Sequence, residues 1–156
     1  FSNLINAGCY LIERDALADL ASMPHSIERE VFPRIAEAGE MSGLVFTGYF
    51  VDAGTPASFI EAAQVCIANG RYSSGQLNGD SWLGDGSHCD GFLSGSSIGA
   101  GSNVGAGASL TDCVVLAGAN IGAGASLTRC LVGEGAGVTP GAEFSDTIVG
   151  HHAHAE

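Results

Sequence analysis

The sequence predicts two modules in one chain: an α/β segment over residues 1–75 and an all-β stack of repeated coils over residues 76–156. Two observations predict this division. Most aromatic and charged residues precede residue 75, whereas Gly, Ala and Ser dominate after it. The second half also repeats every 17 residues, and a regular internal repeat is typical of stacked units that share one continuous core.

The repeat is clearest in two segments, GAGASLTDCVV at 105–115 and GAGASLTRCLV at 122–132, which are identical at nine of eleven positions. A 17-residue offset also aligns three apolar columns, which we expect to point inward from the three sides of about four coils. The columns are Leu93, Leu110, Leu127 and Phe144; Ile98, Val115, Val132 and Val149; and Val104, Ile121 and Val138. Small residues such as Ala108 and Cys113 lie two positions before a column, where the interior is narrow. We expect the corner glycines to permit bends with positive φ; they are Gly99, Gly101, Gly105, Gly107, Gly122 and Gly124.

The first 70 residues carry three helix signals. Asp15 is placed to cap a short helix towards Leu20, and Ser26 to cap a second helix that is disturbed by Pro33 and stops at Gly39. The third signal has Thr55 as cap and Pro56 at the first helical position. Its apolar face contains Phe59, Ile60, Ala63, Cys66 and Ile67. Residues 3–12 and 44–52 read as strands.

The charge balance excludes some partners. The net charge is −12, and all five basic residues are arginines, so we expect neither nucleic acid nor an anionic membrane as a partner. No run of 18 apolar residues occurs, and the first residues lack the basic region of a signal peptide, which predicts a cytoplasmic protein. The five cysteines form no CxxC pair, which favours free thiols.

The segments SIGAGSNVGAGASL and NIGAGASLTRCLVGEGAGV resemble the hexapeptide repeat of left-handed parallel β-helices. The left hand is implied by this resemblance. Hexapeptide β-helices occur in acyltransferases, whose sites use a histidine and a loop that interrupts the repeat. Here residues 104–149 contain no insertion, and His88 reads as a turn residue, so an acyltransferase is the less favoured alternative.

Three motifs in order, SNLINAGCYLI, SIEREVFP and GYFVDAGTPASFIEA, resemble the C-terminal part of the sugar-phosphate nucleotidyltransferases. The resemblance implies the end of a Rossmann-like domain, followed by the β-helix that several members carry. It also implies formation of an NDP-sugar and pyrophosphate from a nucleoside triphosphate and a sugar 1-phosphate, with Mg²⁺ as cofactor. Mannose 1-phosphate and GTP are favoured by resemblance, while glucose and heptose phosphates stay open.

The resemblance also implies site residues. Asp52 falls where the family's second metal-binding aspartate lies, the alternative being a carboxylate that caps the following turn. Asn6, Gly8 and Tyr10 fall in the strand that lines the sugar pocket, where they would approach hydroxyl or phosphate groups. Asn6 is equally typical of a turn, and Tyr10 of a core aromatic. Glu28 and Arg29 are expected on a solvated helix face.

Other family parts are missing from the sequence: the glycine-rich loop, the first metal-binding aspartate and a Glu-Lys pair. With no lysine, we expect a piece of a longer enzyme that is inactive alone and carries no assignable catalytic residue. The alternative is a non-catalytic regulatory or oligomerisation module, since faces rich in Ala and Ser suit a homo-oligomer. The terminal histidines, His151, His152 and His154, suggest either a frayed end or a transition-metal cluster.

Overall fold

The computed structural model describes residues 4–17, 26–72 and 74–156. The chain divides into two compact units, Phe1–Phe50 and Val51–Glu156. The structural boundary thus precedes the third predicted helix, because that helix packs on the coils. The division into a nucleotidyltransferase part at 1–75 and a β-helix at 76–156 stays a prediction about family modules.

The first unit is helical where its described residues have regular structure. A 3₁₀ helix, η1, covers Arg14–Leu17; a π-helical turn, η2, covers Ile27–Val31 and leads into α1 at Phe32–Glu37. The Ser26 side chain accepts a hydrogen bond from the Arg29 backbone N–H at 3.3 Å, which confirms the predicted cap. The wide turn ends two residues before Pro33, which has no N–H for a regular helical bond. Gly39, at φ +73°, ends the helix as predicted.

Two predictions for this unit have a different outcome. The helix expected from Asp15 is a 3₁₀ turn as far as Leu17, and its continuation towards Leu20 lies outside the described residues. The predicted strands are wrong, because residues 4–12 and 44–52 form no strand. Strands need ladder hydrogen bonds to a neighbour, and within the described residues neither segment has one. Their apolar side chains are consequently exposed, Leu11 and Leu44 almost completely.

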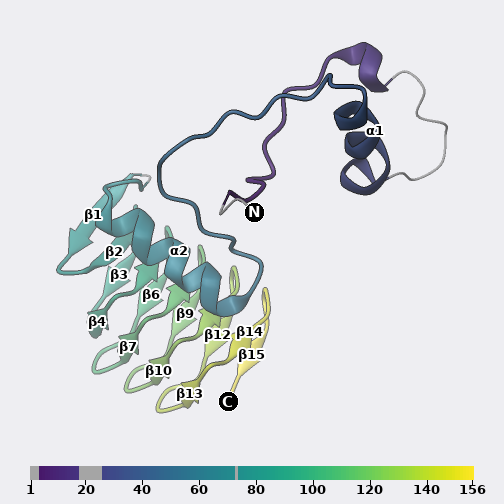
Figure 1. The fold of residues 1–156 in the computed structure, drawn as a ribbon. Coiled ribbons are helices and arrows are strands. Elements are labelled where there is room, and N and C mark those ends of the chain that lie inside the picture. Colours follow the sequence, from purple (N-terminus) through teal and green to yellow (C-terminus); the bar gives the residue numbers. More distant parts are fainter. Residues whose placement is uncertain (1–3, 18–25, 73) are drawn as a thin grey trace. The chain divides into compact units, whose positions relative to one another are not determined.

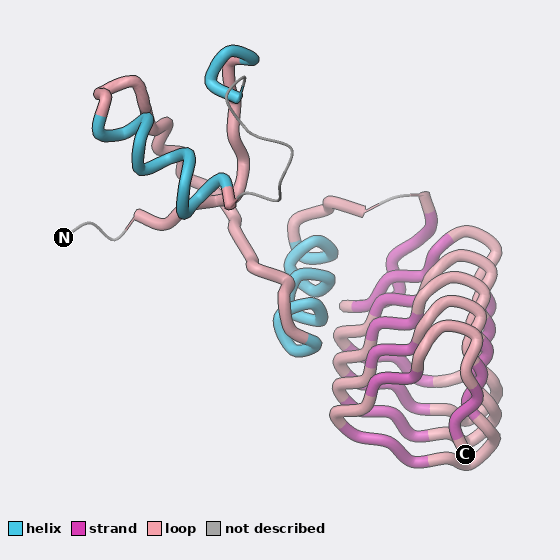
Figure 2. Tube along the Cα trace, turned by 90° about the vertical axis from the view of Figure 1, so that its right-hand side faces the viewer, coloured by secondary structure: helices cyan, strands magenta, loops and turns pink. Residues whose placement is uncertain are grey.

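The second unit is built around a parallel β-helix of three sheets (Figure 2). One sheet has the order β1-β2-β5-β8-β11-β14, the second β13-β10-β7-β4 and the third β15-β12-β9-β6-β3. The strands are β1 Gly75–Asn78, β2 Ser81–Gly84, β3 His88–Cys89, β4 Phe92–Ser94, β5 Ser97–Ile98, β6 Asn103–Val104, β7 Ser109–Thr111, β8 Val114–Val115, β9 Asn120–Ile121, β10 Ser126–Thr128, β11 Leu131–Val132, β12 Gly137–Val138, β13 Glu143–Ser145, β14 Ile148–Val149 and β15 His154–Ala155. Except for the antiparallel β1–β2 hairpin, every pairing is parallel.

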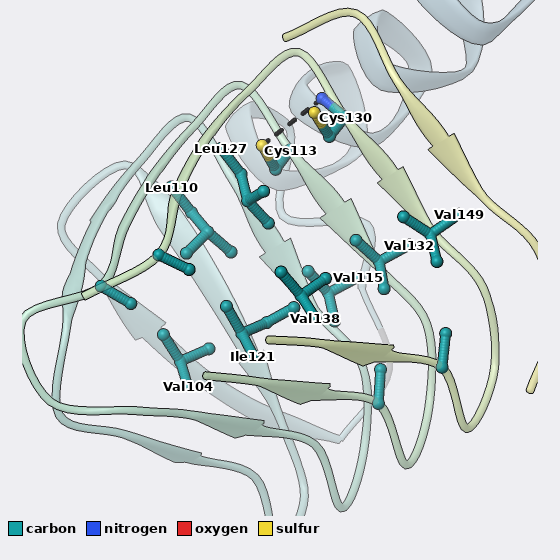
Figure 3. Close-up of a cluster of buried hydrophobic side chains, with 14 of the residues drawn as sticks. Val104, Leu110, Cys113, Val115, Ile121, Leu127, Cys130, Val132, Val138 and Val149 are labelled. Carbon is teal, nitrogen blue, oxygen red and sulfur yellow. Dashed lines mark hydrogen bonds between the residues drawn. The ribbon is translucent and has the colours of Figure 1, made fainter. Parts of the chain in front are cut away.

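The register places residues 17 apart on neighbouring coils, as the repeat predicts. Leu110 pairs with Leu127, and Val115 pairs with Val132. The three predicted columns form the core (Figure 3), where Ile98, Val115 and Ile121 are no more than 1% exposed. The all-β half of the predicted fold, a left-handed parallel β-helix of about four coils, is confirmed.

The corner glycines serve two purposes instead of the single one predicted. Gly101, Gly107 and Gly124 adopt positive φ, as expected. Gly99, Gly105 and Gly122 do not, but a Cβ at each would collide with the backbone of the next coil. At Gly105 such a Cβ would lie 2.7 Å from the Ala123 nitrogen. These three positions are therefore glycine because the coils approach each other closely there.

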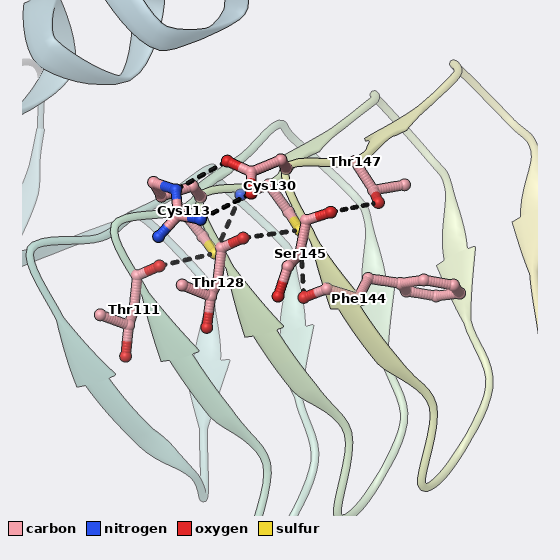
Figure 4. Close-up of polar contacts among 9 residues, drawn as sticks. Thr111, Cys113, Thr128, Cys130, Phe144, Ser145 and Thr147 are labelled. Carbon is pink, nitrogen blue, oxygen red and sulfur yellow. Dashed lines mark hydrogen bonds and ion pairs between the residues drawn. The ribbon is translucent and has the colours of Figure 1, made fainter.

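Cys113 and Cys130 stack in one interior column as free thiols (Figure 4). The Cys113 sulfur lies 3.2 Å from the Thr111 carbonyl oxygen and accepts a hydrogen bond from the Cys130 backbone N–H at 3.5 Å. Burial raises the pKa of the Cys113 thiol to about 12. A buried thiol that stays protonated is a poor nucleophile, which supports the interpretation that these cysteines fill space.

The terminal histidines form part of the last coil, so the expectation of a frayed end is wrong. His154 lies in β15, which pairs with β12. Gly135 and Gly137 make room for His152 and His154, because a Cβ at either glycine would meet an imidazole ring. The His151 Nδ1 accepts a hydrogen bond from the Glu134 backbone N–H at 3.0 Å.

The helix α2, Pro56–Ala68, lies along the coils (Figure 1). The predicted cap is confirmed, since the Thr55 side chain accepts a hydrogen bond from the Ser58 N–H at 3.2 Å. The predicted apolar face is wrong in part: Ile60 is buried, but Phe59 is 42% exposed and Cys66 is exposed. The helix is turned so that Gln64 meets the coils.

Gln64 connects α2 to a corner of the β-helix. Its Nε2 donates to the Asp112 carboxylate at 2.6 Å and to the Gly95 carbonyl at 3.2 Å. Asp112 belongs to a column of residues with positive φ that continues with Arg129 and Asp146. Arg129 donates to the Asp146 carboxylate from both Nε, at 2.6 Å, and Nη2, at 2.5 Å.

Substitutions at two corner glycines should separate the two roles of glycine. We expect Gly105→Ala to lower the free energy of unfolding by about 1–3 kcal/mol, because its Cβ meets backbone that cannot move freely. Gly107→Asn should cost less than about 1 kcal/mol, since Asn tolerates positive φ. Urea unfolding followed by circular dichroism measures both. Equal losses would show that close approach does not matter at Gly105.

We expect Gln64→Glu to loosen α2 from the coils, because the donor to Asp112 becomes a second carboxylate. A lost hydrogen bond to a charged group costs about 1.5–3 kcal/mol, and repulsion adds to that loss. Hydrogen exchange of the α2 backbone amides measures the effect, with Gln76→Glu on exposed β1 as the matched control. Unchanged protection of α2 would contradict the anchoring role of Gln64.

Candidate functional site

The predicted sugar-site residues Asn6 and Tyr10 lie together in the first unit and share a third partner, Glu28. The Tyr10 hydroxyl donates to Glu28 Oε1 at 2.6 Å. The Asn6 Nδ2 donates to the Tyr10 hydroxyl at 2.6 Å and to Glu28 Oε1 at 3.3 Å. The three side chains therefore form one hydrogen-bonded group, which we call the polar triad.

Backbone and ring contacts hold the polar triad in place. Gly8 adopts φ +68°, and its backbone N–H donates to Asn6 Oδ1 at 2.9 Å. This turn points the amide nitrogen of Asn6 at its two partners. The Tyr10 ring packs edge-on against Phe32, with ring centroids 4.7 Å apart. Asn6 is therefore a turn former, as one alternative proposed, and its side chain is also a member of the triad.

The carboxylate of Glu28 changes the pKa of the Tyr10 hydroxyl. The pKa of Tyr10 is raised, first because its hydroxyl donates to Glu28, while the bond from Asn6 acts in the opposite direction. The alternative that Tyr10 is a core aromatic is wrong, since its side chain is exposed. All three triad members face solvent, so their remaining hydrogen-bonding capacity is accessible to a ligand.

Glu28 is the residue that sequence reasoning missed. It was expected on a solvated face of its helix, and it is exposed there, but it also has two side-chain partners. Tyr10 and Glu28 lie 18 residues apart in two different segments of the chain, so no local sequence pattern signals their contact. Arg29, its neighbour, contributes its backbone N–H to the Ser26 cap.

Asp52 belongs to the second unit and lies on the segment that leads to the Thr55 cap of α2. Its side chain is exposed, so it is not buried in hydrocarbon. A Cβ at Gly54 would lie 3.2 Å from Asp52 Oδ1. The carboxylate therefore folds back over Gly54, and glycine provides the room for it.

Among residues 4–17, 26–72 and 74–156, neither a cluster of metal-binding side chains nor a membrane-spanning helix is found. These residues contain no group of three or more His, Cys, Asp or Glu side chains that could hold a metal ion. They also contain no helix that is long and apolar enough to span a bilayer.

His88 lies in β3 and not in a turn as expected, and its Nε2 is 3.0 Å from the Asp90 carboxylate.

Known proteins resemble this chain. Residues 56–153, more than half of the chain, match the family described as "GlmU-like, C-terminal hexapeptide". Over 72 residues the chain is 39% identical to probable mannose-1-phosphate guanylyltransferase 2 of Oryza sativa subsp. japonica and 36% identical to probable mannose-1-phosphate guanylyltransferase 2 of Arabidopsis thaliana. Each alignment covers 46% of this chain and 20% of the relative.

A third relative is the mannose-1-phosphate guanylyltransferase catalytic subunit beta of Drosophila pseudoobscura pseudoobscura, which is 42% identical over 59 residues, or 38% of this chain and 16% of that protein. The chain thus matches a fifth or less of the length of these curated relatives. The resemblance to sugar-phosphate nucleotidyltransferases that its motifs predict is confirmed, and the chain belongs to the GlmU-like C-terminal hexapeptide family.

Proposed function

We propose that this chain is part of a nucleotidyltransferase that forms an NDP-sugar and pyrophosphate, with mannose 1-phosphate and GTP as the first substrates to test. The observation that carries the proposal is the polar triad, which gathers two of the three predicted sugar-site residues on one exposed surface. The relatives named mannose-1-phosphate guanylyltransferases support the choice of substrates.

The proposed reaction is a displacement at the α-phosphorus of the nucleoside triphosphate. A phosphate oxygen of the sugar 1-phosphate forms the new P–O bond, and the bond to the β-phosphate breaks to release pyrophosphate. Mg²⁺ would neutralise the charge that accumulates on the phosphates. In this chain, Asp52 is the proposed ligand for Mg²⁺, because its carboxylate is exposed and carboxylate oxygens suit this ion.

Asn6, Gly8 and Tyr10 are the residues proposed to build the sugar site. Gly8 lets the backbone turn beside Asn6, and a Cβ at Gly8 would meet no atom within 4 Å. This open space allows a ligand to approach the backbone. The β-helix would then be a scaffold, with a homo-oligomer as one arrangement of the complete protein.

The second candidate is a non-catalytic oligomerisation or regulatory module. Two apolar side chains on the outer surface of the coils favour it, since Phe92 is 76% exposed and Ile148 is 60% exposed. Phe92 lies in β4 and Ile148 in β14, strands of two different sheets, so each side chain suits a separate contact with another subunit. In this case the front segment would serve only as a platform.

A pyrophosphate-release assay decides between the two candidates. The full-length protein that contains this chain is incubated with Mg²⁺, each nucleoside triphosphate and mannose, glucose or heptose 1-phosphate. We expect turnover, and we expect Asp52→Asn to lower kcat by about 100-fold or more, because neutral amides bind Mg²⁺ weakly. Asp85→Asn, an exposed aspartate of the coils, is the matched control.

If no combination of these substrates leads to release of pyrophosphate, the enzymatic proposal is rejected. If turnover occurs but Asp52→Asn behaves like Asp85→Asn, then Asp52 is not the metal ligand. Light scattering of the same preparations measures the oligomeric state. A stable oligomer without any turnover supports the non-catalytic module.

A further inference from the structure

The bonds within the polar triad determine which of its atoms are left for a ligand. Asn6 has both ends of its amide engaged, Oδ1 by the Gly8 N–H and Nδ2 by two acceptors. The Tyr10 hydroxyl has one hydrogen, and it is directed at Glu28. Both contacts to Glu28 use Oε1. Among the described residues, Glu28 Oε2 has no hydrogen-bond partner, and the side chain is exposed.

We propose that Glu28 is the specificity-determining residue of the sugar site, with its carboxylate accepting hydrogen bonds from hydroxyl groups of a hexose while Asn6 and Tyr10 position it. This inference rests on the proposed function and assigns its substrate contact to a residue outside the predicted set. A carboxylate has about four acceptor positions and no donor. The free oxygen of Glu28 therefore suits hydroxyl groups, each of which brings a hydrogen to donate.

The same geometry argues against phosphate as the group bound here. A phosphate needs donors or a positive charge, whereas the donors of Asn6 and Tyr10 are already directed at Glu28. The unpaired oxygen of the triad is also negatively charged, and like charges at close range repel. The triad thus faces the hydroxyl side of the sugar 1-phosphate, and its phosphate lies elsewhere.

Local structure explains why Glu28 stays in place without a ligand. The residue lies in the first turn of η2, whose start is held by the Ser26 cap. Carboxylates are stabilised near the exposed N–H groups of a helix start. The Tyr10 ring rests against Phe32 one turn further along, so both partners of the short Tyr10–Glu28 bond are supported from the same helical segment.

The first measurement tests the triad itself in this chain. In protein labelled with ¹³C-tyrosine, NMR titration gives the pKa of Tyr10 separately from Tyr49 and Tyr72. Glu28 raises the pKa of Tyr10, so Glu28→Ala should lower it, whereas Glu37→Ala on exposed α1 should not. Because the pKa of Tyr10 is higher in the folded than in the unfolded protein, the contact stabilises the fold fully at a pH below the unfolded pKa of about 10. This stabilisation is lost as the pH rises through the folded pKa. An unchanged pKa would overturn the inference.

The second measurement tests ligand choice by direct binding to the full chain. Saturation-transfer NMR with mannose should show a signal that Glu28→Ala abolishes and Glu37→Ala retains. Inorganic phosphate, followed by ³¹P line width, should show no binding that depends on Glu28. Mannose binding that survives Glu28→Ala, or phosphate binding lost with it, overturns the inference even if the pKa of Tyr10 falls. These outcomes are independent of turnover, so they are distinguishable from failure of the proposed function.

In the full-length protein, the same variants should separate binding from chemistry. We expect Glu28→Ala to raise the KM for the sugar 1-phosphate by about tenfold or more with a smaller change in kcat, because the lost contact is distant from the reacting phosphorus. Deoxy analogues of the sugar 1-phosphate identify the hydroxyl group that Glu28 binds. The analogue that lacks this hydroxyl should have a higher KM than the parent sugar in the wild type, but the same KM as the parent sugar in Glu28→Ala. Identical preference in both proteins would overturn the assignment.

Discussion

The stacking distance between coils is the constraint on which the second unit depends. Parallel strands in a ladder lie about 4.8 Å apart, so each position must accept its equivalent 17 residues later. The interior columns satisfy this requirement with aliphatic side chains that pair in register, such as Leu110 with Leu127. The corners satisfy it with glycine, since a Cβ at Gly105 or Gly122 would collide with the backbone of the next coil. One spacing thus explains both the large and the missing side chains.

The regular surface of the coils provides a fixed platform for α2. The helix uses Ile60 for apolar contact and Gln64 for hydrogen bonds to the corner at Gly95 and Asp112. Asp52 precedes the capped start of this helix by three residues, with Thr55 as the cap. The platform therefore restricts the segment that carries the proposed metal ligand, without contributing a reactive group of its own. The buried cysteines agree with this view, because burial keeps the thiol of Cys113 protonated.

The polar triad of the first unit lies on its surface. Asn6, Tyr10 and Glu28 come from a segment without regular structure and from the start of a helix. Their mutual bonds leave a carboxylate oxygen facing solvent, which suits a ligand rich in hydroxyl groups. The exposed apolar residues at 4–12, which flank Asn6 and Tyr10, and those at 44–50 form no strands. A strand pattern alone does not produce a strand, because ladder partners are required.

The sequence by itself determined the features that recur at short or regular spacing. The 17-residue columns, the caps at Ser26 and Thr55 and the stop at Gly39 all depend on neighbours along the chain or on the repeat, so they could be predicted. Tertiary structure alone decided the contact of Glu28 with Tyr10 and the rotation of α2 that turns Gln64, and not Phe59, towards the coils. These depend on residues that meet without a sequence period, and packing and hydrogen bonding across the fold select them.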